Sequence, residues 1–307
     1  MKAESDPWWM RAFALAGVVG ISFSAIFVRL SGASPSTAAI FRTAYALPLL
    51  VIGWMVIRRR DLRSGFSRWM AFLAGVFLAI DLALWHRAIV YIGAGLATVL
   101  ASTQVVFVGL IAWLVHRERP STLALATIPV VFGGITLISG LGRRDAYGSN
   151  PLLGVVYGIL AGLAYTVFLV IFRYSNRRLV PAVAPLLDAT AGALAGSIPL
   201  AWFDRHLDLA FHWPMHGWLL ALAIVAQVCG WLLITVALPR LPALDTSVLL
   251  VLQPMLTVLW GLLIFSEFLS PLQWSGVSLV VAGVTLLSLR GTSVRTERAQ
   301  PIEPALP

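Results

Sequence analysis

Long apolar segments follow one another along most of the chain, and short polar stretches separate them. Each segment has the length, about 20 residues, that a helix needs to cross a hydrocarbon core of about 30 Å. The pattern predicts ten helices, at residues 12–30, 36–57, 69–90, 93–115, 121–141, 152–174, 182–202, 216–238, 243–265 and 271–289. We therefore predict an all-α polytopic membrane protein whose short loops leave no room for a separate soluble domain.

Two of these segments share one arrangement of polar residues. TVLASTQVVFVGLIAWLVHRE (98–118) and SVLLVLQPMLTVLWGLLIFSE (247–267) each place a glutamine fourteen residues before a glutamate: Gln104 before Glu118, and Gln253 before Glu267. The offset of 149 residues extends from Ala88 and Ala237 to Ser139 and Ser288. The chain is therefore predicted to contain two repeats, residues 1–146 and 147–292, followed by a disordered cytoplasmic tail at 293–307.

The predicted number of helices in each repeat is five, an odd number, so the two repeats must cross the membrane in opposite orientations. An inverted repeat has a pseudo-two-fold axis in the membrane plane, and transporters built this way bind their substrate near mid-membrane, where the halves meet. Gln104 and Gln253 are then symmetry mates that we expect to face one shared cavity.

The composition agrees with a membrane protein. Hydrophobic residues make up 59% of the chain and charged residues 11%, whereas a soluble domain has about 25% charged residues. With the N-terminus inside, 16 of the 22 Lys and Arg residues lie on the cytoplasmic side. The positive-inside rule therefore explains the net charge of +9 and predicts cytoplasmic termini, without nucleic acid as a partner. Cys229 is the single cysteine, which excludes an internal disulfide or thiolate metal cluster.

Several motifs resemble one known family. HRER (116–119) and FSEFLS (265–270) close the fourth and ninth predicted helices with an acidic residue, and the glycine-containing VFGGITLIS (131–139) and VVAGVTLLS (280–288) lie in the fifth and tenth. Over residues 10 to 290 the chain resembles the EamA-type branch of the drug/metabolite transporter superfamily. This resemblance implies efflux of small metabolites, with bacterial amino-acid exporters as the most similar members.

Ionisable residues within the predicted helices are few. A charge at the centre of a membrane helix costs roughly 2.5–3.5 kcal/mol, so such a residue is expected to face protein or water. Asp81 and Arg42 are either a buried pair that holds helices together or contacts for a zwitterionic solute, whose carboxylate an arginine binds in bidentate fashion. His86 is an interfacial residue, a lining residue at the outer mouth of the cavity or a proton carrier.

Uncharged polar and aromatic residues complete the predicted cavity. Gln104, Gln227 and Gln253 either join helices or bind a neutral or zwitterionic solute, and Pro254 frees a backbone carbonyl beside Gln253. A set of aromatic residues away from the membrane interfaces either packs or stacks on the solute: Tyr45, Trp85, Tyr165, Trp231 and Trp260.

Other residues are predicted to be structural. Glu118 and Glu267 lie at helix ends, where solvation is available, and we expect them to cap a loop or to pair with Arg117, Arg119 or a basic residue near the other repeat. Gly154, Gly158 and Gly162 form consecutive GxxxG steps that allow close helix approach.

The chain contains none of HExxH, GxSxG, Walker A or GxGxxG, so we predict no enzyme activity, cofactor or metal. The leading hypothesis is a secondary exporter of aromatic or hydrophobic amino acids in the cell (inner) membrane, with a small-molecule substrate and the lipid bilayer as partners and with the chain acting as a monomer. The alternatives are export of a nucleotide sugar or cationic drug, or an intramembrane lipid-modifying enzyme using Asp81, His86 and Arg87.

Overall fold

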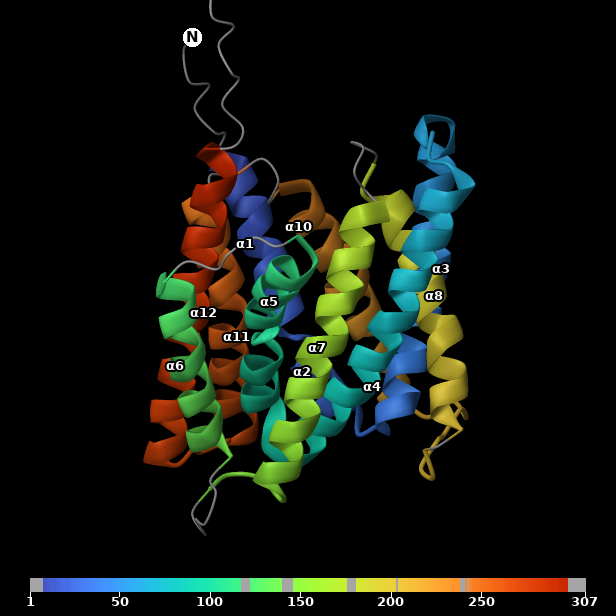
Figure 1. Cartoon of the computed structure of the whole chain (residues 1–307). Helices are drawn as coiled ribbons and strands as arrows, with labels where there is room; N and C mark the ends of the chain where they lie inside the picture. Colours follow the sequence, from blue (N-terminus) through green and yellow to red (C-terminus); the bar gives the residue numbers. More distant parts are fainter. Residues whose placement is uncertain are drawn as a thin grey trace, which may run out of the picture.

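The computed structural model of the chain describes residues 8–116, 122–139, 146–175, 181–202, 204–237, 241 and 243–297. Within these ranges all regular structure is helical, and the helices form one elongated bundle (Figure 1). The first half contains α1 (Trp8–Ser22), α2 (Ser24–Ser31), α3 (Pro35–Ile57), the 3-10 turn η1 (Arg58–Arg60), α4 (Gly65–Ala101), α5 (Gln104–His116) and α6 (Thr122–Ile138). The second contains α7 (Pro151–Ser175), α8 (Val183–Ala201), α9 (Met215–Ala221), the π-helical η2 (Leu222–Gly230), α10 (Trp231–Ala237), α11 (Ala243–Phe265) and α12 (Pro271–Glu297).

Six segments of the described chain are long and apolar enough to cross a membrane: Trp8–Ser31, Pro35–Arg60, Gly65–Ile111, Pro151–Ser175, Val183–Ala201 and Met215–Ala237. Three shorter apolar helices accompany them, at Ala126–Ile138, Val251–Phe265 and Pro271–Leu287. The predicted all-α class is confirmed, while the count of ten membrane helices stays a prediction. Helix α1 begins, and α12 ends, at the same end of the bundle (Figure 1).

Two predicted helices are interrupted. The segment predicted at 12–30 breaks at Phe23, between α1 and α2, and the segment predicted at 93–115 breaks at Ser102 and Thr103, between α4 and α5. The chain changes direction inside α4 at Gly93, whose φ of 80° lies in the left-handed region that glycine adopts without steric cost. The turn between the predicted third and fourth helices is therefore made at a single residue.

Glycines allow the closest helix contacts. A Cβ at Gly75 of α4 would lie 1.9 Å from the carbonyl oxygen of Ala189 in α8, so the two backbones nearly touch. The predicted packing glycines of α7 lie against the other repeat: Gly154 faces Ile92, Gly158 faces Leu100, and Gly162 faces Ala101. This face brings the broken segment from Ile92 to Gln104 into contact with α7.

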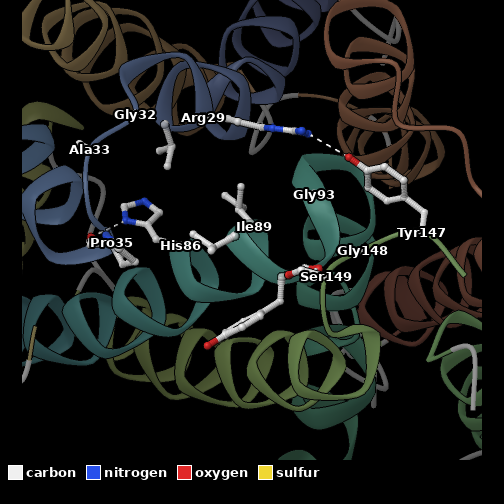
Figure 2. Close-up of a pocket in the computed structure, with 13 residues that line it drawn as sticks. Arg29, Gly32, Ala33, Pro35, His86, Ile89, Gly93, Tyr147, Gly148 and Ser149 are labelled. Atoms are coloured by element: carbon white, nitrogen blue, oxygen red, sulfur yellow. Dashed lines mark hydrogen bonds between the residues drawn. The ribbon is translucent and has the colours of Figure 1, made fainter. Parts of the chain in front are cut away.

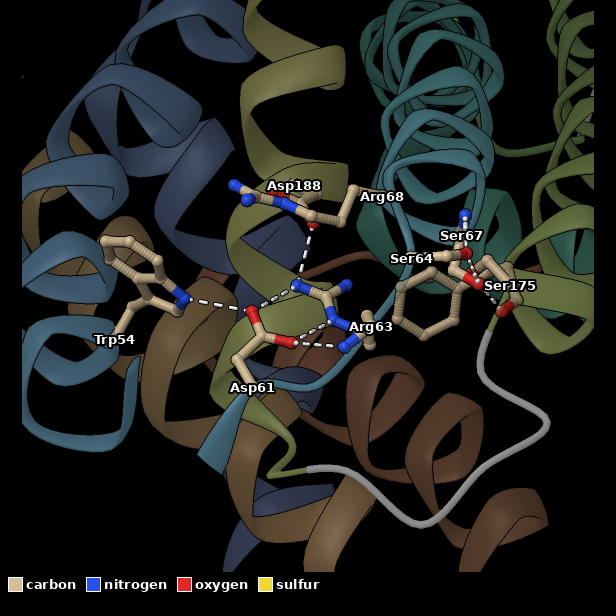
Figure 3. Close-up of polar contacts among 9 residues, drawn as sticks. Trp54, Asp61, Arg63, Ser64, Ser67, Arg68, Ser175 and Asp188 are labelled. Carbon is tan, nitrogen blue, oxygen red and sulfur yellow. Dashed lines mark hydrogen bonds and ion pairs between the residues drawn. The ribbon is translucent and has the colours of Figure 1, made fainter. Parts of the chain in front are cut away.

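An ionic cluster joins the repeats at the end of the bundle where α3 stops and α4 starts (Figure 3). Asp61 accepts hydrogen bonds from Arg63 Nε at 2.8 Å and from Trp54 Nε1 at 3.0 Å. The same Arg63 contacts Asp188 of α8 at 2.8 Å, and Arg68 lies 3.7 Å from that carboxylate. The Arg63 hydrogen bonds lower the pKa of Asp61, which lies in the loop outside the membrane-spanning segments, to about 2.

The helix α12 extends to Glu297, so residues 293–297 of the predicted disordered tail are helical. No proline interrupts this segment before Pro301, which allows the helix to continue. Residues 298–307 lie outside the described residues.

Candidate functional site

A central cavity of about 100 Å³ lies between the two repeats. Seven of the predicted residues line it: Arg42, Asp81, Trp85, Gln104, Tyr165, Trp231 and Gln253. The remaining lining residues are Ile21, Ser24, Leu78, Leu82, Thr98, Ala101 and Ser102. The structure thus brings side chains from α1, α2, α3, α4, α5, α7, α10 and α11 to one polar and aromatic chamber, and both glutamines of the repeat pattern are among them.

Arg42 is the cationic group of this cavity, and the protein holds it in place. Its Nε donates to Gln227 Oε1 at 2.7 Å, and its Nη1 donates to Ser24 Oγ at 2.9 Å. Gln227 in turn donates from Nε2 to Thr190 Oγ1 at 3.3 Å. Gln227, which is fully buried, therefore acts behind the cavity wall as the group that orients Arg42.

Asp81 faces the same cavity but does not form a direct ion pair or hydrogen bond with Arg42 in the described part of the chain. The guanidinium instead contacts Ser24 and Gln227, so the hypothesis of a closed Arg42–Asp81 pair does not describe this conformation. Gln104 also has a buried Oε1 without a hydrogen-bond partner among the described residues. The cavity therefore presents one oriented cation and two acceptor groups that a bound molecule could satisfy.

An aromatic wall forms one side of the cavity. The Trp231 ring lies edge-on to Phe168 at a centroid distance of 5.8 Å and to Tyr165 at 6.4 Å. Tyr165 and Phe168 are themselves 5.3 Å apart. This wall can bury an apolar side chain beside the charged groups.

Four predicted cavity residues lie elsewhere. Tyr45 bonds through its hydroxyl to His216 Nδ1 at 2.5 Å, and Trp260 stacks on Phe23 at 4.8 Å while donating to Ser22 Oγ. Gln227 lies behind Arg42, as described above, and His86 lines a second cavity. The His216 ring bonds to the Tyr45 hydroxyl and the Ser22 hydroxyl accepts from Trp260 Nε1, so both side chains have partners within the protein and lie outside the cavity lining.

Three hydroxyl residues of the lining were not predicted: Ser24, Thr98 and Ser102. Ser24 follows the break at Phe23, and Ser102 lies in the break between α4 and α5. Because Ser and Thr are common in membrane helices as packing residues, their presence gave no signal. The helix breaks, which single them out, are visible only in the structure.

The second cavity, of about 430 Å³, lies where the start of α3, the Gly93 turn of α4 and the loop at Tyr147 meet (Figure 2). Its polar lining comes from Arg29, His86, Tyr91, Tyr147 and Ser149. Trp85 lines the central cavity and His86 the second one, with 5.4 Å between their ring centroids. The two chambers are thus neighbours across one turn of α4.

Glu267 is buried rather than solvated, with 2% of its side chain exposed. Its carboxylate accepts hydrogen bonds from the N–H groups of Ala94 at 2.8 Å and Gly95 at 3.1 Å, and it pairs with Arg29. Gly93 and Gly261 leave room for it, because a Cβ at either position would lie within 2.6 Å of a carboxylate oxygen. The start of the helix after Gly93 and Arg29, a basic residue of the other repeat, therefore take the place of water around Glu267.

The equivalent Glu118 lies outside the described residues. Pro254 lies within α11, directly after the cavity residue Gln253.

An internal polar cavity shared by two halves of an apolar helical bundle is typical of membrane transporters. The model of the EamA-like transporter family matches residues 8–140 and again 152–289, and the chain belongs to this family. The two matches correspond to the two repeats seen in the sequence pattern.

Relatives support the same class. The chain is 26% identical over 274 residues to an "Uncharacterized transporter" of Archaeoglobus fulgidus, covering 87% of this chain and 94% of the relative. It is 28% identical over 233 residues to uncharacterized transporter sll1319 of Synechocystis sp., covering 74% and 69%. A solved structure titled "Crystal structure of protein" has a TM-score of 0.60 at 15% identity, with 95% of this chain and 99% of that chain covered, which shows a shared fold. The chain is a polytopic membrane transporter and not an enzyme.

Proposed function

We propose that this transporter is a secondary exporter of small zwitterionic metabolites, most readily amino acids with aromatic or hydrophobic side chains. It resides in the cell (inner) membrane with both termini in the cytoplasm, acts as a monomer and exposes the central cavity alternately to the two sides. The observation that carries the proposal is the placement of Arg42, Asp81 and an aromatic wall around one cavity between the repeats.

Each part of an amino acid has a matching group there. The oriented guanidinium of Arg42 suits a carboxylate. The carboxylate of Asp81 interacts electrostatically with Arg42 but has no hydrogen bond among the described residues, and it suits an ammonium group. Trp231 and Tyr165 offer apolar surface for the side chain. The present cavity is small for an aromatic solute, so binding requires the repeats to move apart.

Other solutes fit less well. Arg42 is the single cation among the residues that line the central cavity, and a phosphorylated nucleotide sugar would call for more. A cationic drug would be repelled by the Arg42 guanidinium and would leave that group without an anionic partner. Both alternatives remain as outcomes of the transport assay.

Counterflow in proteoliposomes tests the proposal. Liposomes containing purified protein are loaded with unlabelled amino acids of different side-chain classes, and entry of labelled phenylalanine, leucine or threonine is followed. We expect saturable entry that internal phenylalanine or leucine accelerates. If no internal amino acid accelerates entry although the protein is folded, the amino-acid assignment is wrong.

Cavity variants test the site itself. Arg42→Gln and Asp81→Asn should each reduce counterflow about tenfold or more, since each removes a charge that pairs with the solute. Gln104→Leu and Gln253→Leu should also reduce flux without affecting membrane insertion. Ser278→Ala, an exposed position on α12, is the matched control and should behave as the unmodified protein. Full activity in all four cavity variants would exclude this chamber as the site.

A further inference from the structure

The second cavity has the features of a binding site in its own right. It is larger than the central cavity, at about 430 Å³, and two strongly polar groups, Arg29 and His86, lie on different sides of it (Figure 2). They come from α2 and α4, and the loop residue Tyr147 closes the wall beside Arg29. None of these groups contributes to the central cavity.

Arg29 is held in position while part of its hydrogen-bonding capacity stays unused. Its Nη1 donates to Tyr147 Oη at 3.3 Å and pairs with Glu267, and its guanidinium lies 4.2 Å from the centre of the Phe265 ring. Nε and Nη2 have no partner within the described part of the chain, and 33% of the side chain is exposed. An arginine that is already oriented, with two N–H groups available, suits a carboxylate.

His86 supplies an acceptor that the protein leaves unsatisfied. Its side chain is fully buried, and Nδ1 lies 2.9 Å from the carbonyl oxygen of Pro35. A carbonyl oxygen can only accept, so Nδ1 carries the hydrogen and Nε2 of the neutral ring carries a lone pair. Nε2 has no partner among the described residues, although buried acceptors are normally paired. A donor from a bound molecule would satisfy it.

We propose that this cavity is a second binding site for the zwitterionic solute, with the carboxylate on Arg29 and the ammonium group on His86 Nε2. The inference rests on the proposed function and adds a separate location for the solute. Glu267 already neutralises much of the charge on Arg29, so the site favours a zwitterion over a doubly charged anion. Trp85 of the central cavity and His86 of the second one are consecutive in α4, so the two cavities lie beside the same turn of this helix.

Equilibrium binding of labelled phenylalanine to the purified full-length protein in detergent tests this proposal by counting sites. The unmodified protein should bind two equivalents. Arg29→Gln and His86→Phe should each weaken one of them about tenfold or more, and Arg42→Gln should weaken the other. Arg87→Gln is the matched control, since Arg87 bonds to the Ala83 carbonyl oxygen and lines neither cavity.

Ligand analogues provide a test that does not depend on the folding of any variant. Phenethylamine lacks the carboxylate and N-acetylphenylalanine lacks the ammonium group, so each should bind weakly at both sites of the unmodified protein. An equivalent that either analogue retains in Arg42→Gln would contradict zwitterion recognition by Arg29 and His86. Binding of a single equivalent, abolished by Arg42→Gln, would overturn the second site even if counterflow is normal. Two equivalents without any counterflow would preserve this site and remove the transport assignment instead.

Discussion

Replacing Glu267 by glutamine tests how strongly the buried carboxylate fastens the two repeats. The substitution keeps the size of the side chain and removes its charge. Glutamine retains one acceptor oxygen, so one of the bonds from the Ala94 and Gly95 N–H groups is lost and an amide NH₂ faces a donor. Arg29, at the same time, loses its ionic partner.

The expected magnitude follows from the burial of the two partners. A hydrogen bond to a charged group contributes about 1.5–3 kcal/mol, and the Glu267 side chain is only 2% exposed, so little water replaces what is lost. Arg29 is 33% exposed, and we therefore assign the ion pair itself no more than about 1 kcal/mol. The sum predicts a loss of about 1.5–4 kcal/mol in the free energy of unfolding.

Reversible unfolding of the purified protein in mixed detergent micelles measures this loss. Asp208→Asn serves as the control, because Asp208 is 47% exposed, its ionic partner His212 is exposed as well, and asparagine keeps an oxygen that can accept from the Ala210 N–H; it should change stability by less than about 0.5 kcal/mol. A double-mutant cycle with Arg29→Gln should give a coupling energy of about 1 kcal/mol. If Glu267→Gln is as mild as Asp208→Asn, the reasoning from buried hydrogen bonds to repeat attachment is refuted.

Two further predictions concern the ionic cluster at Asp61 and the contact between α4 and α8. The pKa of Asp61 is lowered from 3.8 to about 2, so the ionised carboxylate stabilises the fold above pH 4. This contribution, at most about 2 kcal/mol, is lost as the pH falls toward 2. Asp61→Asn should therefore be less stable than the unmodified protein at pH 7, and the difference in the free energy of unfolding, measured at each pH, should vanish near pH 2. Gly75→Ala should lower the thermal stability strongly, because the added Cβ meets backbone atoms of Ala189, whereas Gly133→Ala in α6, which meets nothing within 4 Å, should leave the melting temperature equal or higher. Equal melting temperatures for these two glycine variants would contradict the close backbone contact.

Much of the architecture could be predicted because it depends on patterns that repeat along the chain. The constant offset that pairs Gln104 with Gln253 predicted two halves that share a cavity, and the structure places both residues in its lining. Charge and depth also singled out Arg42 and Asp81, since an ionisable residue within a membrane helix must face protein or water and not lipid.

The contacts that complete the sites depend on tertiary structure. The break at Ser102 and Thr103 contains neither proline nor glycine, so the local sequence does not predict it. Glu267 follows a helix end, where solvation is available, but the chain brings the N–H groups after Gly93 to it from 172 residues away. The second cavity likewise combines α2 and α4 with the loop at Tyr147, positions that are unrelated in sequence.

The interruption at Phe23 has a consequence for the speed of transport. Ser22, directly before it, accepts hydrogen bonds from two residues of α11: Thr257 Oγ1 donates to its carbonyl oxygen at 3.0 Å, and Trp260 Nε1 donates to its hydroxyl at 3.0 Å. Water has little access at this depth, so these bonds cannot be exchanged for bonds to solvent before the halves separate. In the alternating exposure of the cavity that we propose, each cycle breaks the Trp260–Ser22 bond and forms it again, whereas Thr257 keeps the Gln253 carbonyl as a second acceptor at 3.1 Å. The proposal therefore places an enthalpic barrier in the conformational step and predicts a turnover rate that rises steeply with temperature.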